Sequence, residues 1–116
     1  MVINNRTKTD IQRAQLIVAA VTLEFGTPYM DVKSKSRGSS DICFARQLSM
    51  YLMNVIYGIS LSRIGRAFNR DRSTASHACN VMEDYREDQQ LDNKIARLEQ
   101  FLNASTALAA SEEVSS

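Results

Sequence analysis

The chain has 116 residues, of which 44% are hydrophobic and 23% charged, as in one soluble globular domain. It holds four Gly and one Pro, with no Asn-Gly or Asp-Gly pair to turn a β-hairpin. No apolar run approaches the roughly 20 residues of a membrane helix, no signal peptide opens the chain, and two cysteines make no disulfide framework. These features predict an all-α protein of the cytoplasm with no membrane partner.

The net charge of +1 hides an uneven distribution. The stretch from Lys33 to Arg72 carries eight basic and two acidic residues, whereas the chain from Glu83 onward carries eight acidic and three basic ones. A basic middle joined to an acidic tail fits a surface that faces a polyanion. Charges that merely solvate helix faces would give the same pattern, so charge alone leaves both interpretations open.

A first helix is predicted from Ile11 to Phe25, where apolar residues recur at helical spacing. Asp10 is its candidate N-cap, and Gly26 a plausible stop. Residues 1–9 are expected to fray. This helix is so apolar that it must be buried, either against the rest of the domain or against a second copy in a homodimer. Residues 1–28 are therefore treated as an N-terminal packing or dimerisation element.

A connector over residues 27–40 contains a short basic arm and precedes a second helix. That helix is predicted from about Ile42 to Tyr57, with Asp41 or Ser40 as its N-cap. Gly58 stands at the position where a left-handed residue ends a helix.

Two further helices are separated by a very short turn. Ser60 caps a third helix, Leu61 to Phe68, and Asp71 caps a fourth, Arg72 to Arg86, with Asn69 and Arg70 as the turn between them. A last helix runs from about Asn93 to Leu102, and the Ala/Ser/Glu-rich tail over residues 103–116 is expected to be disordered.

The third and fourth helices have the architecture of a helix-turn-helix. In such a motif the second helix enters the major groove of DNA with its N-terminal residues first, and here those residues are Arg70 to Thr74. Arginine can form two hydrogen bonds with guanine, and Ser or Thr can bond a base edge. Because paired helices with polar outer faces also occur in bundles without a ligand, a protein-interaction module remains the alternative.

Three segments resemble the C-terminal DNA-binding domain of the bacterial replication initiator DnaA in order, spacing and residue type: Ala45 to Leu52, Gly58 to Phe68 and Arg70 to Cys79. The resemblance spans about residues 29–102. It implies a small domain of about five helices, similar to DnaA domain IV and to the TrpR fold. It also implies a nucleoid-associated protein that binds double-stranded DNA and regulates transcription or replication initiation.

The resemblance also implies which residues contact DNA. The recognition helix would enter the major groove, the basic loop would enter the minor groove, and further side chains would contact phosphate. By position these are Arg70, Asp71, Arg72, Ser73 and Thr74 for the recognition helix, Lys33, Lys35 and Arg37 for the loop, Arg46 for a phosphate, and Arg63 and His77 for a phosphate or a structural contact.

The sequence departs from the family pattern in three places. The turn is one residue shorter, Arg72 stands where the family has His, and Ala75-Ser76 replaces a pair of aliphatic residues. These departures leave the base specificity open, and they motivate the alternative of a helix-turn-helix scaffold that has lost specific DNA binding and serves protein interaction.

No catalytic or cofactor site is predicted. The chain lacks the Gly-x-x-x-x-Gly-Lys-Ser/Thr loop of the initiator's ATPase module, and no nucleophile–base pair can be named. One His and two cysteines without Cys-x-x-Cys spacing do not make a zinc site. We therefore expect no enzyme activity, no nucleotide, no cofactor and no metal.

Overall fold

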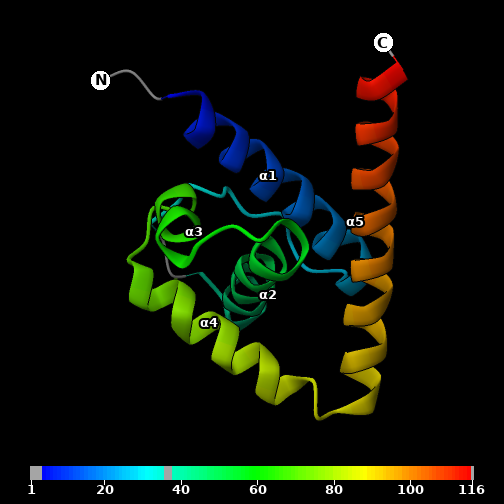
Figure 1. Cartoon of the computed structure of the whole chain (residues 1–116). Helices are drawn as coiled ribbons and strands as arrows, with labels where there is room; N and C mark the ends of the chain where they lie inside the picture. Colours follow the sequence, from blue (N-terminus) through cyan, green and yellow to red (C-terminus); the bar gives the residue numbers. More distant parts are fainter. Residues whose placement is uncertain (1–3, 36–37, 116) are drawn as a thin grey trace.

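The computed structural model describes the backbone of residues 4–35 and 38–115, with side chains as far as residue 105. Within those ranges the protein consists of helices without strands, as predicted (Figure 1). The helices are α1 (Asn5–Phe25), α2 (Ser40–Tyr57), α3 (Leu61–Ala67), α4 (Arg72–Tyr85) and α5 (Gln89–Ser115). None of these helices, over the described residues, is long and apolar enough to cross a membrane.

Helix α2 lies at the centre of the fold, packed against each of the other four helices (Figure 1). It contributes a continuous run of buried residues from Leu48 to Met53. A helix that is buried all round has to be apolar on every face, which explains why the only fully buried polar side chain of this run, Ser49, bonds back to the Ala45 carbonyl at 2.7 Å.

Helix α1 buries one apolar stripe inside the domain. Ala14, Ile17, Val18 and Val21 are fully buried, at the spacing of one helix face, and α1 packs on α2 and α3. The stripe that might have paired with a second copy is therefore covered by the domain itself. Gly26 ends the helix with φ 65°, in the left-handed conformation that favours glycine.

The predicted start of α1 is wrong. Asn4, not Asp10, caps the helix, since its side chain accepts a hydrogen bond from the Thr7 amide at 2.8 Å. Residues 5–9, which were expected to fray, form its first turns. Apolar periodicity starts only at Ile11, so the polar turns before it carried no signal of helix.

The other helix ends deviate by smaller amounts. Ser39 caps α2 in place of the predicted Asp41 or Ser40, and its Oγ accepts from the Ile42 amide at 3.3 Å. Helices α3 and α4 each end one residue earlier than predicted, at Ala67 and Tyr85.

Helix α5 is longer at both ends than predicted. It begins at Gln89 and continues to Ser115, through most of the segment 103–116 that was expected to be disordered; residue 116 lies outside the described residues. Ile95, Leu98 and Leu102 bury one face of it against the core. Ala and Glu are good helix formers, and a helix nucleated by packing extends at little cost, so a polar composition alone was a poor guide.

Arg86 fixes the angle between α4 and α5. Its Nε donates to the Asp92 carboxylate at 2.6 Å, its Nη2 pairs with Glu99 at 3.0 Å, and its Nη1 donates to the Tyr51 hydroxyl at 3.1 Å. These partners raise the pKa of the Arg86 guanidinium above its usual range. The arginine that follows α4 thereby joins α2, α4 and α5.

An ion pair ties α1 to α3. Asp10 is only 3% exposed, and its two carboxylate oxygens accept from Nε and Nη2 of Arg63 at 3.0 and 2.7 Å. A bidentate geometry offsets the desolvation of a buried carboxylate better than a single contact does. The position of the first helix-turn-helix helix therefore depends on α1.

The helix-turn-helix turn requires a close backbone approach. A Cβ at Gly65 would lie 2.7 Å from the Arg70 carbonyl oxygen, and the Arg70 amide donates to the Gly65 carbonyl at 2.7 Å. Asn69 has φ 59°, a left-handed conformation that Asn tolerates better than most residues. The shortened turn is therefore compatible with an intact motif.

Replacing the buried carboxylate should lower stability. We expect Asp10→Ala to reduce the free energy of unfolding by about 1–3 kcal/mol, because it leaves a half-buried guanidinium without its partner. Urea denaturation followed by circular dichroism measures this. Glu87→Ala, at an exposed position, is the control and should change it by about 0.5 kcal/mol or less. Equal effects of the two substitutions would contradict the assignment.

A side chain at Gly65 should disturb the turn. We expect Gly65→Ala to cost about 1–3 kcal/mol, because the obstructing atoms are backbone that cannot rotate away. Ser62→Ala, on the exposed side of the same helix, is the matched control. Thermal unfolding of both variants tests this, and an unchanged melting temperature for Gly65→Ala would show that the turn is looser than described.

Candidate nucleic-acid interface

The beginning of α4 presents polar side chains to solvent. Asp71, Arg72, Ser73, Thr74 and His77 are all exposed, while Ala75, Ala78 and Met82 turn inward. Arg72 has no ion pair or side-chain hydrogen bond with the residues that the structure describes. Asp71 occupies the N-cap position but its side chain makes no capping bond. The first turn of α4 is thus available for an external partner.

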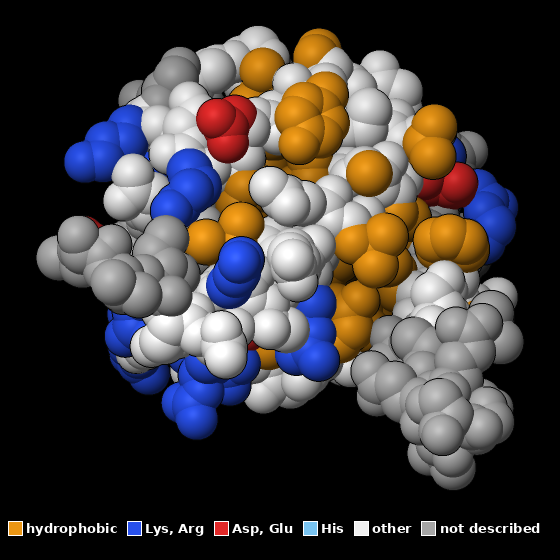
Figure 2. Space-filling model, turned by 90° about the horizontal axis from the view of Figure 1, so that it is seen from above, with side chains coloured by type: hydrophobic (Ala, Val, Ile, Leu, Met, Phe, Trp, Pro, Cys, Tyr) orange, Lys and Arg blue, Asp and Glu red, His pale blue; other side chains and the backbone are white. Residues whose placement is uncertain are grey.

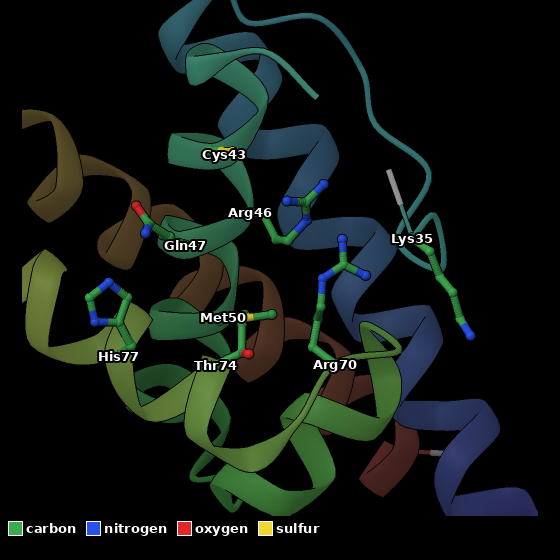
Figure 3. A pocket seen from close by; sticks show the side chains of 8 residues that line it. All are labelled: Lys35, Cys43, Arg46, Gln47, Met50, Arg70, Thr74 and His77. Atoms are coloured by element: carbon green, nitrogen blue, oxygen red, sulfur yellow. The ribbon is translucent and has the colours of Figure 1, made fainter. Parts of the chain in front are cut away.

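Beside this turn lies a cavity of about 340 Å³. Figure 3 shows that it is bounded by the loop before α2, by α2 itself and by the start of α4. Its lining residues are Lys35 from the loop, Cys43, Arg46, Gln47 and Met50 from α2, and Arg70, Thr74 and His77 from the turn and α4. Segments far apart in the sequence therefore bring their cations to one place.

Two guanidinium groups meet in this cavity. Arg46 is 7% exposed, and its side chain points toward that of Arg70 (Figure 3). Burial lowers the pKa of the Arg46 guanidinium and the charge of Arg70 lowers it further, against an opposing contribution from the Cys43 thiol. Both main effects penalise the positive charge, and an anion placed between the guanidinium groups would relieve that penalty.

Arg70 also holds the basic loop against the turn. Its Nη1 donates to the Ser34 carbonyl at 2.9 Å and to the Asn69 carbonyl at 3.3 Å. The Asn69 side-chain amide reaches the Lys33 carbonyl at 3.4 Å. These bonds fix the start of the loop relative to α4, so Arg70, predicted as a recognition-helix contact, serves at least as a positioning residue.

The structure brings together most of the predicted site residues and separates one. Lys33 and Lys35 are exposed on the loop that docks on the turn, whereas Arg37 lies outside the described residues. Arg63 is engaged by Asp10 on α1, so its guanidinium is occupied within the fold. The sequence gave no sign of this, because the two partners are 53 positions apart.

Gln47 and Cys43 were missed as site residues. Together with Arg46 and Met50 they stand at spacings of three and four, which places them on one face of α2. A polar pair at positions 46 and 47 within an otherwise apolar helix was the available signal. It marks the side of α2 that is not covered by other helices.

A short helix, a tight turn and a second helix whose exposed first turn adjoins a cationic cavity define a helix-turn-helix domain of the DNA-binding class. Comparison with known families agrees, since the family described as bacterial dnaA protein helix-turn-helix matches residues 14–81. The chain belongs to this family.

The relatives are replication initiators. The chain is 37% identical over 90 residues to the chromosomal replication initiator protein DnaA of Lachnoclostridium phytofermentans. It is 35% identical over 92 residues to that of Microcystis aeruginosa, and 38% identical over 85 residues to that of Thermodesulfovibrio yellowstonii. These alignments cover 76%, 78% and 72% of this chain but only 20%, 20% and 18% of the relatives. The chain thus spans about a fifth of their length, without the ATPase module.

Removing the charge of Arg46 should separate stability from binding. We expect Arg46→Met to change the free energy of unfolding by about 1 kcal/mol or less, because lost contacts are offset by relief of a buried charge, while duplex DNA binding weakens. Chemical denaturation and fluorescence anisotropy with a labelled duplex measure the two quantities. Unaltered DNA affinity in a folded variant would remove Arg46 from the interface.

Proposed function

We propose that the protein binds a specific element of double-stranded DNA and acts in the bacterial nucleoid as a regulator of transcription or of replication initiation. The observation that carries this proposal is the convergence of Lys35, Arg46 and Arg70 beside the exposed first turn of α4. Cations gathered next to a recognition helix supply the phosphate contacts on which affinity largely depends.

The exposed first turn of α4 suits the major groove. Arg72, Ser73 and Thr74 would face base edges, where Arg can bond guanine O6 and N7. A cation at a helix N-terminus is disfavoured by a few tenths of a kcal/mol, which a base or phosphate partner would offset. The uncapped Asp71 carboxylate is free to accept from a cytosine amino group.

The loop before α2 suits the adjacent minor groove. Lys33 and Lys35 are exposed there, Arg37 belongs to the same segment, and the bond from Arg70 to the Ser34 carbonyl holds the loop beside α4. One rigid unit could then contact both grooves, with Arg46 and His77 directed to the phosphates between them. A minor-groove arm reads groove width and A·T content rather than individual bases.

The relatives' role suggests the process in which such a protein takes part. Their printed name is chromosomal replication initiator protein, and a chain that shares their DNA-reading unit without their ATPase would occupy related sites without acting as an initiator. Arg72 stands where that family has His, so the preferred site is expected to differ from theirs at the base under this residue.

Selection of bound duplexes from a random pool tests the proposal and yields the site. On the selected duplex, Arg72→Ala should weaken binding by about 1–3 kcal/mol, which is about 5- to 150-fold in Kd, and relax the preference at one position. Lys35→Ala should weaken all duplexes similarly and reduce the slope of log Kd against log salt by about 1. Lys94→Ala, which removes a cation from α5, should leave affinity unchanged.

The outcomes are distinct. A folded protein that enriches no sequence and binds without salt dependence would contradict DNA recognition and favour the protein-interaction module. Equal losses for Lys94→Ala and Lys35→Ala would show that only overall charge matters and that the cavity is not the interface.

A further inference from the structure

A second surface lies away from the DNA interface, where the last turns of α1 meet α5. A groove of about 260 Å³ opens there between Ala20, Leu23 and Glu24 of α1 and Arg97, Leu98 and Phe101 of α5. In Figure 1, α5 forms one edge of the molecule and α4 begins at the opposite edge. The groove is therefore not part of the nucleic-acid interface.

The groove exposes apolar side chains that the fold does not need. Leu23 is 86% exposed and Phe101 is 57% exposed, although both belong to helices whose other faces are buried in the core. Figure 2 shows hydrophobic side chains gathered in a continuous area on the face seen from above. Contiguous apolar area on a small soluble domain marks a surface that associates with another molecule.

The groove carries both parts of a self-complementary contact. Leu23 protrudes beside the small Ala20 and the buried Leu98, so a projecting side chain and a recess share one face. The charges are also matched, since Nη2 and Nε of Arg97 pair with one Glu24 oxygen at 2.8 and 3.1 Å. The Arg97 side chain is 61% exposed, so it can reach a second carboxylate. A twofold contact needs each patch to complement itself in shape and charge.

We propose that this groove binds a second copy of the chain, with Leu23 of each protomer seated beside Ala20 and Phe101 of the other and the Glu24 and Arg97 pairs facing across the twofold axis. The dimer forms through the outer face of α1 at its C-terminal end and not through the buried stripe of Ala14, Ile17 and Val21. The contact is smaller than the about 800 Å² per partner of a standard interface, so association is weak and depends on protein concentration. It leaves both DNA interfaces exposed.

Sedimentation velocity of the whole chain, from about 10 μM to about 1 mM in the absence of DNA, tests the dimer. We expect the weight-average mass to rise toward twice the monomer value. Leu23→Glu should keep the protein monomeric throughout, whereas Val55→Glu, the same change at an exposed apolar position of α2 that is 43% exposed, should still associate. Thermal unfolding of both variants confirms that they fold.

A charge exchange gives a second measurement. Glu24→Arg alone should abolish association, because like charges then face one another, and adding Arg97→Glu should restore it. A monomer at the highest concentration, or association that Leu23→Glu does not affect, would overturn the proposal. DNA affinity measured at concentrations where the protein is monomeric should be the same for Leu23→Glu and the unaltered chain, so failure of the dimer is distinguishable from failure of DNA binding.

Discussion

The contact of Gly65 with the backbone of Arg70 is the constraint on which the remainder of the site depends. Because no Cβ intervenes, α3 lies directly against the turn, and Asn69 in the left-handed conformation completes the reversal within two residues. This geometry sets where α4 begins and directs the Arg70 guanidinium back to the Ser34 carbonyl. One small residue thereby connects the recognition helix with the basic loop that precedes α2.

The site stores electrostatic repulsion in the free protein. Burial and the neighbouring Arg70 both oppose the charge of Arg46, and neither effect serves folding. Groups that a fold holds against their own preference are common where a partner later supplies the missing interaction. In this protein that partner would be a phosphate group, so part of the DNA affinity would come from repulsion that folding has already imposed.

Local chemistry in the sequence was sufficient for the elements and for the helix-turn-helix. Apolar periodicity located all five helices, and Ser60, Gly26 and Gly58 mark their boundaries correctly because caps and left-handed residues act over a few positions. Signals of this kind could not reveal the Asp10–Arg63 pair or the meeting of Arg46 with Arg70, since those depend on how separate helices cross. They also understated α5, where good helix formers had been taken for a disordered tail.

The anchoring of α3 by Asp10 bears on how an excised fragment would behave. The region shared with the family begins at residue 14 and stops at residue 81, yet the carboxylate that holds Arg63 precedes it, and Ile95, Leu98 and Leu102 follow it. A fragment trimmed to the borders of homology would keep every DNA-facing side chain while losing part of its interior. Expression of the DNA-reading unit therefore calls for the flanking helices on both sides.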